Sequence, residues 1–581
     1  MTQPDADSFA MRFLRGAAWR LPILLLTAWA LALNLSMPFR GLDSDVATFG
    51  LMGNDLLHVG YVPTLTYGQN YLLSITPHLY ALLRWLCPAL SCVMALNLAG
   101  SLLSLGGLWL VYEALLLTVA RDGRQQAWPL VAFCVLVGGS WNYLFDIAVF
   151  SSIELSLLLL GLIAFATARI ERAQVTGVGS PWAVWGLLGL ATGYALCSRP
   201  QMLLFAVPAL CALLFRQRLR PSRLVALLAG VFLGYLPMLL HHLLRAADWP
   251  FHHQLPTQAL TLHTFISAAG IYFTQIAPRI FDIGAEHLLH AALVLLWLIV
   301  VLALYFLPAR LRGATLTLLD HVWAFGALAL VLMMLLAPQL SLNQENRRYC
   351  LHLFLCAAWL FARCAAAPGW RRYAASALLA ALTLATLPMW REQLANARAD
   401  DRAWRAAQAE FIPYLEAQHA PILAPYWDAY VLAFLADGKL PIEAYPWDLV
   451  RTYGRLTEQD MATRTLWLVT AGRGKEAWAR LDQELGAGTA QKMRQQDAPL
   501  RLRDRACELW EFPDATTSVL LMKKFHPHYY SRVPERAIVP RCEIASSRES
   551  PTPLSEMVIV RAALSKSTRT RSSLSPAISS G

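Results

Sequence analysis

The chain has 581 residues, of which 57% are hydrophobic and only 15% are charged, and its mean hydropathy is +0.43. This composition is too apolar for a soluble protein of this length and indicates a polytopic membrane protein. The formal net charge of +11 does not indicate nucleic-acid binding, because the arginines cluster in short loops between apolar runs, where they orient membrane helices.

Apolar runs long enough to cross roughly 30 Å of hydrocarbon occur up to Trp390 and predict about eleven spans. Their limits are 19–35, 92–120, 127–141, 153–169, 182–198, 201–215, 224–242, 288–307, 322–340, 350–366 and 373–390. Arginine-rich connectors such as 121–124, 169–172 and 310–312 are predicted to be cytoplasmic. Every other loop, and everything after Trp390, is then predicted to be extracytoplasmic.

The loop after the first span carries two carboxylates, Asp43 and Asp45, and then the patch Tyr-Gly-Gln-Asn-Tyr at 67–71. Ionised groups at a membrane are costly to leave unpaired, so this combination suggests a reaction centre. Asp-Ser-Asp is also a good helix start, because a carboxylate caps free backbone N–H groups, and one residue can serve both roles. The segment 71–90, interrupted by Pro77 and Pro88, predicts a helix lying in the membrane interface.

After Trp390 the composition becomes that of an ordinary soluble domain. A helical segment at 392–418 is followed by short apolar runs, such as 422–424 and 465–470, that alternate with helical text. This pattern predicts a small α/β domain over 391–545, and the Ser-, Thr- and Arg-rich tail at 546–581 is predicted to be disordered. The predicted fold class is therefore mainly α, a transmembrane helix bundle over 1–390 with an extracytoplasmic α/β domain.

Several short motifs resemble the GT-C superfamily of membrane glycosyltransferases. The resemblance is to the bacterial branch related to protein mannosyltransferases and the aminoarabinose transferase, glycosyltransferase family 39. The motifs are Asp43-Ser44-Asp45 after the first span, the helix at 53–57, the patch at 67–71, Ser198-Arg199-Pro200-Gln201, Arg347-Arg348-Tyr349 before a late span, and 426–430 in the outer domain. These motifs are spread over most of the chain, although each of them is short.

The resemblance implies an inverting glycosyltransferase at the outer face of a bacterial inner membrane. Such an enzyme moves a sugar from a polyprenyl-phosphate carrier to a hydroxyl or phosphate of an envelope lipid, glycan or protein. Asp45 is expected to act as general base, with Asp43 sharing the role or holding the site. Asp146, in the second outer loop, is expected to assist the first aspartate or a bound metal. No cofactor is firmly implied, and a divalent cation is compatible with these acidic residues.

Residues expected to bind substrate lie in three of these motifs: Tyr67, Gln69, Tyr71, Arg199, Arg347, Arg348 and Tyr349. Arginines at the outer mouth of a span can clamp a lipid phosphate through the planar guanidinium, or can simply contact lipid headgroups. Tyrosines enriched at a membrane interface serve equally well as anchors, so each tyrosine has that alternative reading.

The sequence departs from the family at two positions. Acidic residues are common in the family where this chain has Val46 and Thr76. This departure favours a different donor or acceptor over an inactive site. Two other classes remain as alternatives: a transporter or flippase of lipid-linked sugars, and a non-catalytic membrane scaffold. The chain shows no pair of related halves of the kind that transporters use.

Overall fold

The computed structural model describes most of the chain up to Phe525. The described residues are 18–58, 65–66, 69–119, 127–141, 143–144, 153–177, 179–216, 220–244, 260–280, 316–337, 349–365, 370–446, 464–470, 474–496, 500–502 and 505–525. All of them fall within one compact unit, Met1–Pro540. The tail predicted at 546–581 and the span predicted at 288–307 lie outside the described residues.

Each predicted span within the described ranges falls on a helix. The helices are α2 (Leu21–Ser36), α5 (Cys92–Val119), α6 (Trp128–Gly139), α8 (Ile153–Val175), α9 (Trp182–Ser198), α10 (Leu203–Arg216), α11 (Pro221–Leu244), α16 (Leu318–Leu336), α18 (His352–Ala365) and α19 (Trp370–Ala406). Helices α8 and α19 run further than the hydrophobicity predicts, because their polar ends keep a helical sequence beyond the apolar run. The chain is therefore mainly helical, as predicted.

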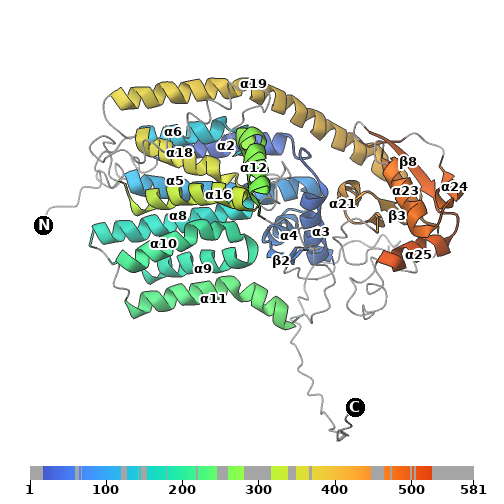
Figure 1. The fold of residues 1–581 in the computed structure, drawn as a ribbon, viewed down its shortest axis with the longest axis horizontal. Helices are drawn as coiled ribbons and strands as arrows, with labels where there is room; N and C mark the ends of the chain where they lie inside the picture. Colours follow the sequence, from blue (N-terminus) through green and yellow to red (C-terminus); the bar gives the residue numbers. More distant parts are fainter. Residues whose placement is uncertain are drawn as a thin grey trace, which may run out of the picture. The chain divides into compact units, whose positions relative to one another are not determined.

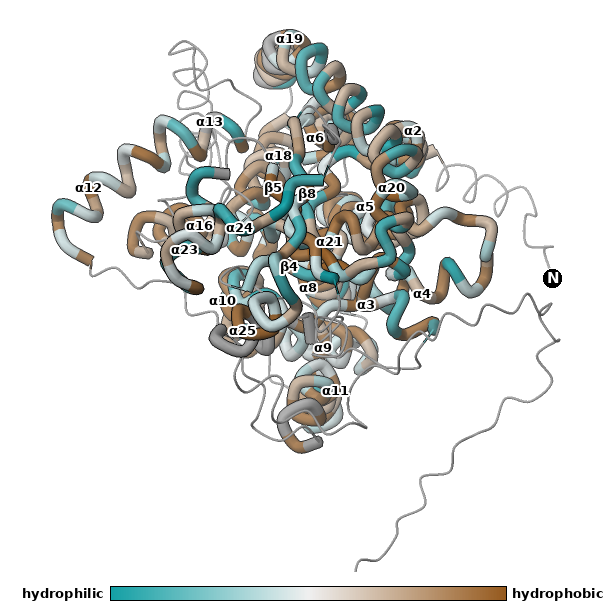
Figure 2. The backbone as a smooth tube through the Cα atoms, turned by 90° about the vertical axis from the view of Figure 1, so that its right-hand side faces the viewer, coloured by the Kyte–Doolittle hydropathy of each residue, from teal (hydrophilic) through white to brown (hydrophobic). Residues whose placement is uncertain are grey.

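Four helical segments in the described part of the chain are long and apolar enough to cross a membrane. They are Cys92–Val119, Pro221–Leu240, Leu318–Leu336 and Arg372–Glu416, and the other apolar helices of the bundle are shorter. Figure 2 shows the contrast in polarity, since α5 and α11 carry many hydrophobic residues whereas β8 (Arg505–Glu511) and α24 (Thr489–Lys492) carry hydrophilic ones. The bundle thus supplies an apolar surface that lipid can cover.

Glycines bring two pairs of helices into backbone contact. A Cβ on Gly193 of α9 would lie 2.1 Å from the carbonyl oxygen of Val231 in α11, and one on Gly234 would lie 2.4 Å from that of Leu190. Between α5 and α8, a Cβ on Gly161 would lie 2.4 Å from the Gly107 carbonyl oxygen. Small residues of this kind let membrane helices approach closely, and here they fix which helices are neighbours.

The first loop forms a small structure of its own, with α3 (Ser44–His58), β1 (Leu65–Thr66), β2 (Gln69–Leu73) and α4 (Thr76–Leu86). The strands β1 and β2 pair antiparallel. The helix predicted over 71–90 is therefore shorter than expected, because Gln69–Leu73 is a strand and the helix begins only at Thr76. Pro77 lies in the first turn of α4, where its missing N–H is not needed, and Pro88 lies beyond the end of the helix.

The C-terminal part contains a mixed six-stranded sheet with strand order β4-β3-β5-β8-β6, and β7 pairs with β8. Its strands are β3 (Ile422–Ala424), β4 (Ile442–Ala444), β5 (Leu466–Thr470), β6 (Arg494–Gln495), β7 (Leu500–Leu502) and β8. The β3 strand is parallel to β4 and β5, whereas β5 is antiparallel to β8. The α/β character predicted for this region is present.

The helix α21 (Tyr426–Leu435) joins this sheet to the first loop. One hydrophobic cluster includes residues of α3, the start of α5, α21 and the central strands. Figure 1 shows α3 beside α21, and α4 beside α3, at one end of the bundle helices. We call this end, where α2 finishes and α5 begins, the Asp45 end, and the opposite end, where α18 finishes, the Arg363 end.

Candidate functional site

Asp43 and Asp45 stand at the start of α3 and have different surroundings. The Asp43 carboxylate accepts a hydrogen bond of 2.8 Å from the backbone N–H of Val46, which is a side-chain cap of the helix. Asp45 lies in the first turn, is half-buried, and accepts a hydrogen bond from the phenol of Tyr426. The capping alternative therefore applies to Asp43, while the Asp45 carboxylate is held from the C-terminal region.

Ser44, between the two aspartates, also binds Tyr426. Its hydroxyl donates a hydrogen bond to the backbone carbonyl of Tyr426. Ser44 is fully buried and Tyr426 is 7% exposed, so the bond from Ser44 is buried, and the bond to the half-buried Asp45 is part-buried. Hydrogen bonds to an ionised carboxylate are stronger than neutral ones, and exclusion of water strengthens them further.

The chain entering α3 is anchored by two carboxylates of α19. The backbone N–H of Phe39 donates to Asp401 Oδ1 at 3.0 Å, and that of Gly41 donates to Asp400 Oδ2 at 2.8 Å. Gly41 has a φ of +62°, a left-handed conformation that favours glycine. The turn before Asp43 is thus fixed by backbone geometry as well as by hydrogen bonds.

A second polar cluster lies among the bundle helices where α8 and α18 begin and α9 ends. Ser156 Oγ and His352 Nε2 are 2.7 Å apart, within hydrogen-bond distance. Arg199 follows α9 as its C-cap residue, is only 8% exposed, and its charge acts on His352. A buried arginine in a membrane protein is costly and indicates a functional site by default.

Three buried polar atoms around the start of α18 have no hydrogen-bond partner within the described ranges: His352 Nδ1, Tyr143 Oη and Tyr272 Oη. The ring of Tyr143 packs against Phe354, with centroids 5.5 Å apart, and Tyr272 is within electrostatic range of Cys350. A buried polar group without a partner costs on the order of 1–3 kcal/mol. Several such groups in one place therefore mark a position suited to a polar ligand.

The first loop lies next to this cluster. Strand β2 contacts α9, and Leu73 of β2 shares a small hydrophobic cluster with Cys197, two residues before Arg199. The backbones of Gln69 and Tyr71, two of the expected substrate-binding residues, therefore lie near Arg199 in the strand β2. Their side chains are outside the described part of the structure.

The remaining expected residues have separate outcomes. Tyr349 is half-buried against the bundle core just before α18. Tyr67, Asp146, Arg347 and Arg348 lie outside the described residues, so their roles remain predictions from the sequence. Among the described residues, no group of three or more His, Cys, Asp or Glu side chains is placed to hold a metal ion.

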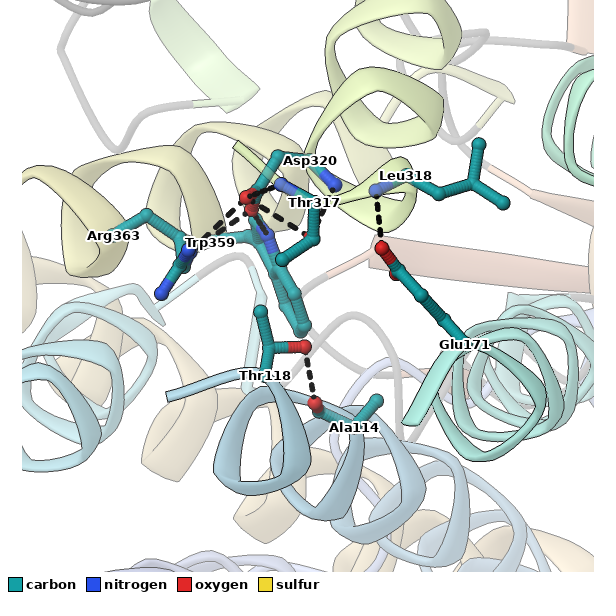
Figure 3. Close-up of polar contacts among 8 residues, drawn as sticks. All are labelled: Ala114, Thr118, Glu171, Thr317, Leu318, Asp320, Trp359 and Arg363. Atoms are coloured by element: carbon teal, nitrogen blue, oxygen red, sulfur yellow. Dashed lines mark hydrogen bonds and ion pairs between the residues drawn. The ribbon is translucent and has the colours of Figure 1, made fainter. Parts of the chain in front are cut away.

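The Arg363 end carries a polar cluster built around a buried carboxylate whose two oxygens are both hydrogen-bonded (Figure 3). The Asp320 carboxylate, at 0% exposure, lies 3.1 and 3.2 Å from Arg363 Nε and accepts a hydrogen bond of 2.8 Å from the indole of Trp359. It also accepts from the backbone N–H and hydroxyl of Thr317 at 2.8 and 3.0 Å, closing a capping box at the start of α16. This carboxylate is bonded on both of its oxygens.

Neighbouring contacts in Figure 3 complete that end. Glu171 of α8 accepts a hydrogen bond of 3.0 Å from the backbone N–H of Leu318, and the hydroxyl of Thr118 donates to the Ala114 carbonyl at 2.8 Å. The bond from Leu318 satisfies a backbone N–H at the start of α16, which lacks an intrahelical partner, whereas the Thr118 bond lies within α5. The contacts of Glu171 and Asp320 join α8 to α16 and α16 to α18, so the cluster stabilises the packing of these three helices.

No protein-family model matches the sequence, and no curated protein matches it. Two crystal structures of ArnT from Cupriavidus metallidurans match the fold. The one bound to undecaprenyl phosphate has a TM-score of 0.50 at 13% identity, covering 84% of this chain and 97% of that one. The apo structure has a TM-score of 0.52 at 14% identity, covering 87% and 99%.

The chain has an ArnT-like fold. This confirms the resemblance to the aminoarabinose-transferase branch that the sequence motifs indicate, at the level of fold. The match extends beyond the helix bundle into the C-terminal region, since 87% of this chain is more than the 390 residues of the bundle. At 13–14% identity the similarity shows the architecture alone.

Sequence reasoning missed the two residues that complete these clusters. Tyr426 belongs to a motif assigned to the outer domain, and its partner Asp45 is 381 positions away, so only the fold brings them together. His352 follows the Arg347-Arg348-Tyr349 motif by three residues. That proximity to the motif is the signal in the sequence that points to His352.

Proposed function

We propose that this protein is an inverting glycosyltransferase that moves a sugar from a polyprenyl-phosphate carrier to an envelope acceptor at the outer face of a bacterial inner membrane. The ArnT-like fold supports the enzyme class, and the ArnT structure with undecaprenyl phosphate supports a carrier of that kind. The single observation that carries the proposal is that the half-buried carboxylate of Asp45 and the buried Arg199 belong to the same end of the bundle.

The chemical step needs one base and one site for a leaving phosphate. Asp45 takes the proton from the acceptor hydroxyl as the acceptor oxygen attacks the anomeric carbon of the sugar. The bond from that carbon to the phosphate oxygen breaks, and its electron pair leaves with the polyprenyl phosphate. Attack from the face opposite the phosphate inverts the anomeric configuration.

The phosphate is proposed to bind beside Arg199 and His352. Arginine presents a planar fork of donors that matches phosphate oxygens, and it stays charged at any physiological pH. His352 Nδ1 and the phenols of Tyr143 and Tyr272 supply polar atoms that are buried and lack partners among the described residues. Arg347 and Arg348 are proposed as further phosphate ligands on the evidence of the sequence alone.

The deciding experiment is a transfer assay with the purified full-length protein in nanodiscs. A panel of undecaprenyl-phosphate sugars, each radiolabelled in the sugar, is mixed with total envelope lipid, glycan and protein as acceptors. The proposal predicts that label from one donor moves to an acceptor and that undecaprenyl phosphate is released. Boiled protein and empty nanodiscs serve as controls.

A transporter or flippase gives a different result. In proteoliposomes it would move the labelled donor between leaflets without transferring the sugar, whereas a glycosyltransferase leaves the donor in its leaflet and labels the acceptor. A scaffold protein would do neither. Loss of donor from one leaflet without any labelled acceptor would contradict the proposed function.

The proposed orientation places the Asp45 end outside the cell. Lys439, just after α21, and Gln174, near the end of α8, are both exposed and mark the two ends. In a background lacking the exposed Cys87 and Cys211, we expect Lys439→Cys to react with a membrane-impermeant maleimide in spheroplasts and Gln174→Cys to react only after lysis. The reverse pattern would invert the orientation and place the site in the cytoplasm.

A further inference from the structure

Helix α21 of the C-terminal region lies alongside α3 and is held to it at three levels. At the start, Ser44 and Asp45 bond to Tyr426. In the middle, a Cβ on Gly50 would lie 2.1 Å from the ring of Phe434, so only glycine allows this approach. The residue numbers increase together along both helices, which shows that α3 and α21 run in the same direction.

The third level is a polar network at the far ends of the two helices. Asn54 Nδ2 donates to Asp437 Oδ1 at 3.2 Å, and Arg84 of α4 forms an ion pair with Asp437 Oδ2 at 3.4 Å. The phenol of Tyr80 donates to Asn54 Oδ1 at 2.6 Å, and burial raises the pKa of Tyr80, so it keeps its proton. Asp437 has a φ of +53°, which shows that the chain accepts a strained residue here.

This docking gives Tyr426 a defined position relative to Asp45. The two hydrogen bonds join adjacent residues, Ser44 to the backbone of Tyr426 and Asp45 to its side chain. The ring of Tyr426 is itself held by edge contacts with Trp427 and Tyr430, whose ring centroids lie 4.9 and 5.6 Å away. The phenol therefore has little freedom to move away from the carboxylate.

We infer that Tyr426 is a positioning residue for the catalytic carboxylate, and that the C-terminal region thereby completes the active site of the membrane domain. The inference rests on the proposed function, because it assigns Asp45 the role of base. Tyr426 neither gives nor takes a proton in the reaction. Its hydrogen bond to Oδ1 fixes the carboxylate rotamer, and a misplacement of about 1 Å in a catalytic group can cost on the order of 100-fold in rate.

The test uses two tyrosines of the same helix. Tyr426→Phe removes the bond to Asp45, and Tyr430→Phe removes a bond of 2.7 Å from another buried tyrosine to Glu443. We expect Tyr426→Phe to lower kcat by about 10- to 100-fold with little change in the donor KM. Tyr430→Phe is expected to keep the wild-type kcat. A normal kcat in Tyr426→Phe, or equal losses in both variants, would overturn the inference.

A second measurement separates this inference from the proposed function. The Tm values of Asp45→Ala, Tyr426→Phe and the double variant form a cycle that does not depend on turnover. We expect the double variant to lose less Tm than the sum of the single losses, because both changes remove one hydrogen bond. Strictly additive losses would sink the Tyr426 inference even in a protein that transfers sugar. Absence of transfer by the wild type would instead sink the proposed function, and the catalytic role of Tyr426 with it.

Discussion

The same two helices carry polar clusters of opposite character at their two ends. Along α8, Ser156 and Glu171 are 15 residues apart, or roughly 22 Å. Along α18, His352 and Arg363 are 11 residues apart, or roughly 16 Å. At the Arg363 end the buried Asp320 is bonded on both oxygens, whereas at the Asp45 end His352 Nδ1 has no partner in the described part of the chain.

The difference shows how to separate structural from functional polar groups inside a membrane protein. A group such as Asp320, which is bonded on both oxygens, stabilises one arrangement of helices, and the fold uses its hydrogen-bonding capacity. Buried polar groups that lack hydrogen-bond partners in the folded protein are destabilising unless they bind a ligand. By this criterion Asp320 holds the helices together. Buried indole N–H groups of Trp128 and Trp323 at the Arg363 end also lack a partner among the described residues, so the chemistry is assigned to the Asp45 end because His352, Tyr143 and Tyr272 gather around the start of α18.

The largest effect on stability is expected at the Arg363 end. Arg363→Met leaves Asp320 buried without its counter-charge, which is expected to lower the unfolding free energy by about 3–5 kcal/mol. Adding Asp320→Asn removes the remaining charge while keeping an acceptor for Trp359, so part of the lost stability should return. Thermal unfolding of purified protein measures both. No recovery in the double variant would show that the network contributes by something other than charge pairing.

The next effect concerns donor binding at the Asp45 end. Arg199→Ala removes a charge-assisted contact to phosphate and is expected to weaken undecaprenyl phosphate binding by on the order of 10- to 100-fold. Arg199→Lys should recover only part, because lysine lacks the planar fork. Arg216→Ala, an exposed position at the other end of the neighbouring helix α10, is the matched control. Unchanged binding in Arg199→Ala would place the phosphate elsewhere.

The smallest effect is expected at Asp43, where both roles proposed from the sequence meet. Asp43→Ala removes the cap on Val46 and should lower the unfolding free energy by about 0.5–2 kcal/mol. Asp43→Asn keeps a capping oxygen and should therefore be close to wild type in Tm. If Asp43 only caps the helix, the transfer rate follows the same order as Tm: Asp43→Asn is close to the wild type and Asp43→Ala is lower. A large loss of transfer in Asp43→Asn with a normal Tm would instead make Asp43 part of the reaction.

Much of the fold could be predicted from the sequence because long apolar runs identify membrane helices. The helices α5 and α9 begin at Cys92 and Trp182, as the apolar runs predicted. The run at 71–90 misled because apolar residues suit a strand as well as a helix, and only pairing with β1 decides for the strand at Gln69–Leu73. Short apolar segments carry this ambiguity by nature.

The candidate site could be predicted only in part. Asp45 stood out because two carboxylates next to a membrane span are unusual, but nothing local indicates that Tyr426 binds it. The same limit applies to Ser156 and His352, which are 196 positions apart and meet through the packing of α8 and α18. Individual residue types were visible in the sequence, whereas the pairs depend on tertiary structure.

One matched pair of substitutions tests the distinction between the two ends directly. Asp45→Asn and Asp320→Asn make the same chemical change, and both are measured for sugar transfer per folded molecule and for Tm. We predict that Asp45→Asn keeps a Tm near that of the wild type and loses on the order of 10²–10⁴ in transfer rate, as expected for loss of a general base. Asp320→Asn should lose Tm and keep its transfer rate. Normal transfer by Asp45→Asn, or loss of transfer by stable Asp320→Asn, would contradict the account.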